Sequence, residues 1–75
     1  MTNTLLLDEK INESGLKLRF IATKIGITYQ AFLNKRNNES EFKAPEIQIL
    51  CELLGLSLQD KEDIFFAPNV DKIST

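Results

Sequence analysis

Apolar residues recur along this chain at intervals of three and four, the spacing that places side chains on one face of an α-helix. The clearest case follows Pro45, where Ile47, Leu50, Cys51 and Leu54 fit the i, i+3, i+4, i+7 pattern. No stretch shows the alternation of apolar and polar residues that is typical of a half-buried β-strand. The pattern therefore predicts an all-α fold.

Capping residues and glycines divide the chain into five short helices. A side chain that accepts a backbone hydrogen bond favours the start of a helix, and glycine favours its end because it adopts positive φ at low cost. Gly15, Gly26 and Gly55 mark three such ends, and Ser57 with Asp60 matches a capping box. The predicted helices cover about residues 4–14, 18–25, 29–36, 45–54 and 58–66.

The rest of the chain is predicted to be irregular. Residues 37–43 indicate a polar loop, and residues 67–75 indicate a C-terminal tail. Seventy-five residues are too few for two hydrophobic cores, so the sequence predicts one domain over residues 1–75.

The second and third predicted helices form a helix-turn-helix over about residues 18–36. Ala22 is small enough for a close approach of the neighbouring helix, and Gly26 permits a sharp turn. Four apolar residues fill the wedge between the helices and fix their angle: Ile21, Ile25, Ile27 and Phe32. A fixed angle allows the second helix to enter the major groove of DNA while the first spans the backbone.

Charge is unevenly distributed along the chain. The whole sequence has nine Lys and Arg against eleven Asp and Glu, a net charge of −2. Residues 16–43 carry six basic and two acidic residues, a net charge of +4, whereas the flanking segments are acidic. A basic segment of this kind indicates an anionic partner for the middle of the chain.

Composition excludes several kinds of chemistry. The chain has no His, so it has no imidazole base and no histidine metal ligand, and its single cysteine, Cys51, fits the apolar core. No apolar run approaches the roughly 18 residues that cross a bilayer, and the N-terminus lacks a signal-peptide pattern. The sequence predicts a cytoplasmic, non-enzymatic protein with no metal site, no cofactor, no small-molecule ligand and no membrane association.

The motif residues resemble the Cro/phage-repressor branch of the XRE helix-turn-helix family. They are Gly15-Leu16-Lys17, Ile21-Ala22, Ile25-Gly26-Ile27-Thr28-Tyr29-Gln30 and Phe32. Residues 41–47 and 51–56 resemble the fourth helix of that family, and residues 64–66 and 69–72 resemble the C-terminal end of small Cro-like regulators of phages and integrated elements in Gram-positive bacteria. The resemblance covers about residues 4–73 and implies a five-helix lambda-repressor-like domain that regulates transcription by binding a palindromic operator as a homodimer.

The same resemblance implies which residues contact DNA. The base-reading residues would be Thr28, Tyr29, Gln30, Leu33, Asn34 and Asn37. An Asn or Gln amide pairs bidentately with adenine in the major groove, which agrees with this assignment. Candidates for phosphate contacts are Lys17, Arg19, Lys35, Arg36, Asn38 and Lys43. Alternatively, Tyr29 packs on Phe32 or caps its helix, and Leu33 packs under the loop.

The sequence departs from the family pattern at both ends of the motif. Leu18 and Phe20 stand where the second helix usually offers a polar residue to DNA, and Arg36 stands where an apolar residue often closes the third helix.

Apolar residues near the C-terminus predict a dimer interface: Leu58, Ile64, Phe65, Phe66 and Val70. The alternative is that these side chains close the bottom of the core. The alternative function is that of an antitoxin or a protein-interaction adaptor built on the same fold.

Overall fold

The computed structural model describes residues 1–66, in which every regular element is helical. The elements are α1 (Thr4–Ser14), α2 (Leu18–Ile25), α3 (Tyr29–Arg36), α4 (Ala44–Leu54), α5 (Leu58–Lys61) and a π-helical segment, η1 (Glu62–Phe66). The predicted all-α class is therefore confirmed. The fifth predicted helix changes from α to π at Glu62, and the predicted tail lies outside the described residues.

Local side-chain caps determine where the helices begin. Asn3 Oδ1 accepts a hydrogen bond from the backbone N–H of Leu6, which satisfies an otherwise unpaired donor at the start of α1. Ser57 and Asp60 form the predicted capping box at α5, each side chain accepting a hydrogen bond from the other residue's backbone N–H. These starts depend on residues within one turn of the helix, so they are readable from sequence.

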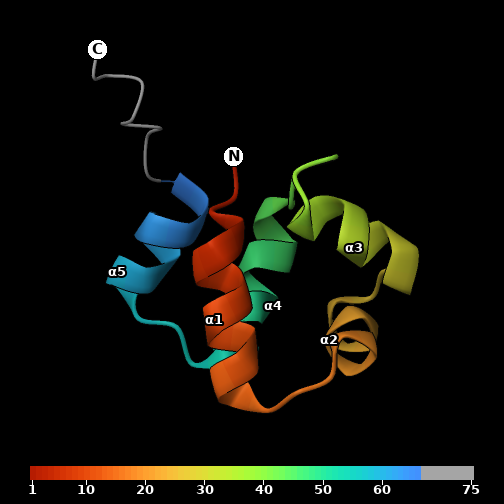
Figure 1. Cartoon of the computed structure of the whole chain (residues 1–75), viewed down its shortest axis with the longest axis horizontal. Coiled ribbons are helices and arrows are strands. Elements are labelled where there is room, and N and C mark those ends of the chain that lie inside the picture. The colour runs from red at the N-terminus through yellow and green to blue at the C-terminus, as the bar shows by residue number, and fades with distance from the viewer. Residues whose placement is uncertain (67–75) are drawn as a thin grey trace.

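The helices are arranged around α1 and α4, which lie in the middle of the molecule (Figure 1). α2 and α3 lie on one side of this pair, and α5 lies on the other. α2 packs against α3 and α4, while α1 packs against α4 and η1. A hydrogen bond of 2.7 Å from the N–H of Asn3 to the carbonyl of Ile64 joins the start of α1 to η1.

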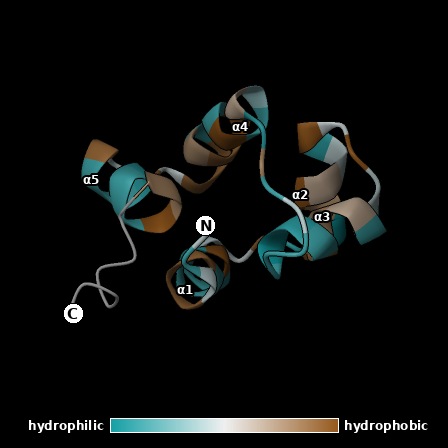
Figure 2. Cartoon of the chain, turned by 90° about the horizontal axis from the view of Figure 1, so that it is seen from above, coloured by the Kyte–Doolittle hydropathy of each residue, from teal (hydrophilic) through white to brown (hydrophobic). Residues whose placement is uncertain are grey.

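One apolar core holds the helices together. Its largest fully buried side chains come from five different elements: Leu7, Ile21, Phe32, Leu50 and Ile64. Burying a side chain of this size contributes about 1.5–3 kcal/mol, so α1, α2, α3, α4 and η1 are each anchored by a residue of their own, whereas α5 has no buried residue. Every helix also carries hydrophilic residues, as expected for short helices with one face toward solvent (Figure 2).

Phe42 corrects the prediction that residues 37–43 form a purely polar loop. Its side chain is buried, with its ring centroid 6.0 Å from that of Phe32 and 5.7 Å from that of Phe65. Three aromatic rings from α3, the loop and η1 therefore meet in the core. This contact fixes the path of the chain as it leaves α3.

The predicted dimer interface needs a correction. Ile64 is fully buried and Phe65 is 7% exposed, so both belong to the chain's own core and neither is accessible to a second subunit. Leu58 and Phe66 are 85% and 52% exposed. Val70 lies outside the described residues. None of the helices described in residues 1–66 is long and apolar enough to cross a lipid bilayer.

Candidate nucleic-acid interface

One face of α3 is turned away from the core. Phe32 points inward from this helix, and Gln30, Leu33, Asn34 and Asn37 occupy the opposite face at helical spacing. Gln30 and Asn37 are exposed, whereas Leu33 and Asn34 are half-buried. The structure thus brings four of the six predicted base-reading residues onto one surface.

Thr28 and Gly26 position the start of this helix. Gly26 has a φ of 89°, a left-handed conformation that favours glycine, and its N–H donates to the carbonyl of Ala22 to close α2. Two residues later, Thr28 Oγ1 accepts the N–H of Ala31 at 3.0 Å. Thr28 is exposed and caps α3, so it remains next to the surface formed by Gln30 and its neighbours.

A side-chain hydrogen bond orders the centre of the α3 surface. Gln30 Nε2 donates to Asn34 Oδ1 across one helical turn, at 3.1 Å. This bond leaves the Gln30 amide with one hydrogen and its carbonyl oxygen for other partners. One donor and one acceptor are what bidentate pairing with adenine requires.

Tyr29 lies at the edge of the surface and contacts α2. The Arg19 guanidinium sits 4.1 Å from the centroid of the Tyr29 ring, in a cation–π contact. Since Thr28 caps the helix, Tyr29 does not have the capping role considered from sequence. An exposed contact of this type contributes about 0.5–1 kcal/mol, enough to favour one placement of the Arg19 side chain.

Three of the predicted phosphate-contacting residues present their charge to solvent. Lys17, Arg19 and Lys43 are exposed, and within residues 1–66 none of them forms an ion pair. Lys17 and Arg19 flank the start of α2, and Lys43 precedes α4. These are the cations that a phosphate group reaches without displacing an acidic side chain.

Lys35 is placed differently from the prediction. Its Nζ lies 2.7 Å and 2.9 Å from the two carboxylate oxygens of Glu46, and both side chains are only 12% exposed. Burial by itself raises the pKa of Glu46, but hydrogen bonds from Lys35 and from the backbone N–H of Lys43, together with their charges, outweigh it and lower this pKa. Lys35 therefore links α3 to α4 and is corrected from phosphate ligand to internal ion pair.

Arg36 and Asn38 are also engaged within the chain. Arg36 Nε lies 2.9 Å from Asp8 Oδ1 in an ion pair between α3 and α1. Asn38 accepts a hydrogen bond from the N–H of Thr2 and donates one to the carbonyl of the same residue, at 2.8 and 2.9 Å. Both residues therefore have partners within the chain, Arg36 through its Nε and Asn38 through its amide, and their phosphate contacts stay predictions.

Sequence reasoning missed these internal partners, and only one left a local signal. Glu46 is the third residue of the helix, where a carboxylate commonly accepts the N–H of the residue before the helix, as it does here from Lys43. Nothing near Asp8 in the sequence indicates Arg36. That pair forms because the fold brings α1 to the end of α3, where Thr4 Oγ1 also donates a hydrogen bond to the carbonyl of Arg36.

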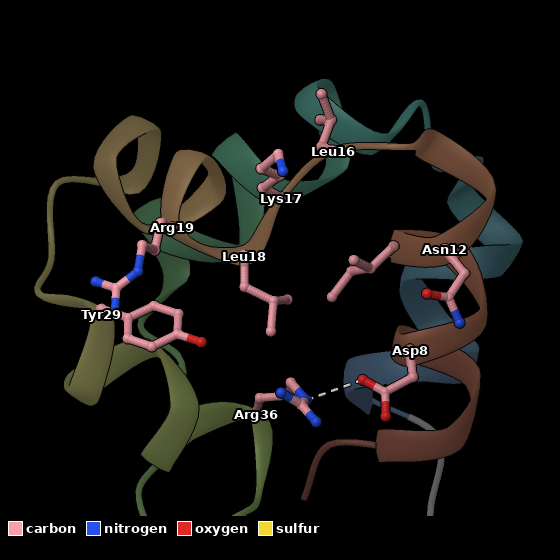
Figure 3. A pocket seen from close by; sticks show the side chains of 9 residues that line it. Asp8, Asn12, Leu16, Lys17, Leu18, Arg19, Tyr29 and Arg36 are labelled. Atoms are coloured by element: carbon pink, nitrogen blue, oxygen red, sulfur yellow. Dashed lines mark ion pairs between the residues drawn. The ribbon is translucent and has the colours of Figure 1, made fainter.

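A groove of about 510 Å³ opens beside the α3 surface, between α1, the start of α2 and α3 (Figure 3). Apolar lining comes from Ile11, Leu16 and Leu18. The polar lining residues are Asp8, Asn12, Lys17, Arg19, Tyr29 and Arg36. Three predicted phosphate contacts, Lys17, Arg19 and Arg36, and one predicted base-reading residue, Tyr29, therefore share this groove.

Comparison with protein-family models, with curated proteins and with solved structures found no match to this chain.

Proposed function

We propose that this protein is a sequence-specific DNA-binding regulator of transcription, with a lambda-repressor-like helix-turn-helix and with α3 in the major groove. The observation that supports it is the amide pair of exposed Gln30 and half-buried Asn34 on the outward face of α3, beside the exposed cations Lys17 and Arg19 at the start of α2. Amides suit base edges and cations suit phosphates, and the turn at Gly26 sets the two groups side by side.

The division of labour follows from accessibility. Gln30, Asn34 and Asn37 read base edges, and Leu33 offers an apolar contact to a thymine methyl group. Lys17, Arg19 and Lys43 bind phosphates and set the register of the helix. The resemblance to Cro-like members of the XRE family, noted from sequence, agrees with this arrangement.

The regulator acts as a homodimer on a palindromic site. One α3 reads only part of one half-site, so two subunits supply the affinity and the symmetry of a full operator. With Ile64 and Phe65 in the core, the exposed members of the predicted interface within residues 1–66 are Leu58 and Phe66. Phe66→Glu places a charge on this surface without altering a buried residue.

Selection of bound sequences from a random pool of duplex DNA tests the proposed function. We expect an enriched palindrome whose half-sites lie one helical turn apart, about 10 base pairs centre to centre. Enrichment of no sequence, together with specific capture of a protein partner through α3, would instead support an antitoxin or adaptor.

Sedimentation at micromolar concentration tests the dimer. We expect the wild-type chain to sediment as a dimer on operator DNA, and Phe66→Glu to weaken that dimer, while Glu52→Gln on α4 leaves it unchanged. A wild-type protein that remains monomeric with and without operator contradicts the dimer.

A further inference from the structure

The groove between α1, α2 and α3 has features that DNA binding does not require. Its volume of about 510 Å³ lies within the range of about 300–1,000 Å³ that is usual for small-molecule sites. Ile11 and Leu18 give it an apolar floor. The Tyr29 ring forms one wall and turns its hydroxyl toward the interior of the groove (Figure 3). A flat apolar group fits between these surfaces.

The charges around the groove favour an anion. Lys17, Arg19 and Arg36 contribute three positive charges and Asp8 contributes one negative charge, a net of +2 in the lining. This excess remains after the ion pair between Arg36 and Asp8 is counted. An anion bound here meets cations on both sides of the apolar floor.

Arg36 supplies the hydrogen-bond donors that favour a carboxylate as the bound anion. Its Nε is buried against Asp8 without an aligned hydrogen-bond acceptor, and within residues 1–66 its terminal nitrogens donate no hydrogen bond. A guanidinium held in this way offers a planar pair of N–H groups, which matches the two oxygens of a carboxylate. Asn12, exposed on α1, adds an amide at the rim of the same groove.

We propose that this groove binds a small aromatic carboxylate, with its ring against Leu18 and Tyr29 and its carboxylate at Arg36. Lys17 and Arg19 line the groove and are also the proposed phosphate contacts, so a bound anion weakens DNA binding. This second statement rests on the proposed function. The sequence predicted no small-molecule ligand, whereas the proposed site lies between α1 and the helix-turn-helix.

Titration of the full chain with 1-naphthoate, followed by amide NMR shifts, tests the binding site. Two probes of the same shape serve as controls, the neutral 1-naphthalenemethanol and the cationic 1-naphthylmethylamine. We expect saturable shifts at Asn12, Leu18 and Tyr29 with 1-naphthoate, and binding weaker by about tenfold or more for the neutral probe because it lacks the charge-assisted hydrogen bonds. Equal affinity for all three probes, or shifts centred on Phe66, would overturn the assignment.

A matched pair of charge changes locates the site without disturbing the core. Asn12→Asp and Gln48→Glu each add one negative charge at an exposed position, and only Asn12 lines the groove. Asn12→Asp should weaken 1-naphthoate binding several-fold, Asn12→Lys should strengthen it, and Gln48→Glu should leave it unchanged. The same response to Asn12→Asp and Gln48→Glu contradicts the site.

Competition with DNA separates this inference from the proposed function. Addition of 1-naphthoate should release the selected operator from the wild-type protein, and the Asn12→Asp variant should need several-fold more. If no DNA is selected at all, the proposed function fails while the NMR titration still decides the groove. If 1-naphthoate fills the groove and the operator stays bound, the statement that a bound anion weakens DNA binding is wrong.

Discussion

Gln30 is the residue on which the proposed base recognition depends most directly. Its amide is exposed on the outward face of α3, and its hydrogen bond to Asn34 restricts its rotation before DNA arrives. A side chain ordered in this way loses less conformational entropy on binding than a free one. Replacing it should therefore change which sequence is preferred more than it changes the affinity for DNA in general.

Gln30→Ala should cost about 1–3 kcal/mol of binding to the selected operator and should relax the preference at one base pair in each half-site. Gln48→Ala, an exposed glutamine of α4, is the matched control and should leave binding unchanged. Repeating the DNA selection with each variant measures both effects. Equal weakening of every DNA sequence by Gln30→Ala would show that Gln30 does not read a base.

The buried ion pair of Lys35 and Glu46 should make the stability of the folded protein depend on pH in the acidic range. Hydrogen bonds and nearby positive charge lower the pKa of Glu46 in the folded protein despite its burial, so its contribution to stability is complete above the ordinary glutamate value of about 4.3. This contribution is lost as the pH falls through the lower folded pKa.

Glu46→Gln should accordingly destabilise the protein at neutral pH by about 1–3 kcal/mol, since it leaves the Lys35 ammonium without its carboxylate. The difference from wild type should shrink as the pH falls through the lowered pKa of Glu46, because the wild-type carboxyl then becomes protonated. Urea denaturation across this pH range measures it, with the exposed Glu52→Gln as control. A difference that is constant with pH would mean that the charge of Glu46 contributes nothing.

At the scale of the elements, sequence signals that act within one turn of a helix were sufficient to predict where α1, α3 and α5 begin and where α2 ends. The starts at Asn3, Thr28 and Ser57 depend on side chains that cap their own helix, and the end of α2 depends on Gly26. The interior of the loop before α4 was not predictable in this way. Phe42 looks like one apolar residue among polar ones until α3 and η1 bring Phe32 and Phe65 against it.

The candidate site was only partly predictable for the same reason. Periodicity places Gln30 and Asn34 on the face opposite Phe32, and the structure agrees. The partners of Lys35 and Asn38, in contrast, depend on contacts between segments that are far apart in the sequence. Lys35 and Glu46 are 11 residues apart, and Asn38 and Thr2 are 36 residues apart, so no local pattern pairs them.

Gly26 tests how strongly the turn depends on backbone conformation. A Cβ at this position meets no atom within 4 Å, so the cost of Gly26→Ala comes from the φ of 89° alone. A left-handed conformation costs a non-glycine residue roughly 1–2 kcal/mol, and asparagine tolerates it better than alanine.

We therefore expect Gly26→Ala to lower the free energy of unfolding by about 1–2 kcal/mol and Gly26→Asn to lower it by less. Thermal or urea denaturation of the two variants measures this. If the two substitutions destabilise the protein equally, the positive φ at Gly26 is not the cause of the destabilisation.

At the scale of the whole molecule, folding redistributes the charge that the sequence arranges in blocks. The basic segment 16–43 loses the free charge of Lys35 to Glu46 and that of Arg36 to Asp8, and these acidic partners come from the two acidic flanks. Four cations of this segment form no ion pair within residues 1–66, and three of them, Lys17, Arg19 and Lys43, are the proposed phosphate contacts. A net charge of −2 over the whole chain also limits attraction to DNA of arbitrary sequence.

The salt dependence of operator binding measures how many of these cations contact phosphate groups. Three phosphate contacts in each subunit give about six in a dimer, so log K should fall with log salt with a slope of about −5. Lys17→Ala removes one contact from each subunit and should reduce the magnitude of the slope by about 2. Lys61→Ala on α5, at the other side of the molecule from α2, should leave the slope unchanged.

Equilibrium binding at several salt concentrations measures the slope. Lys35→Met should not alter it, since that ammonium is held by Glu46. A slope that is flat for the wild type, or that changes as much for Lys61→Ala as for Lys17→Ala, would mean that DNA does not lie against the start of α2.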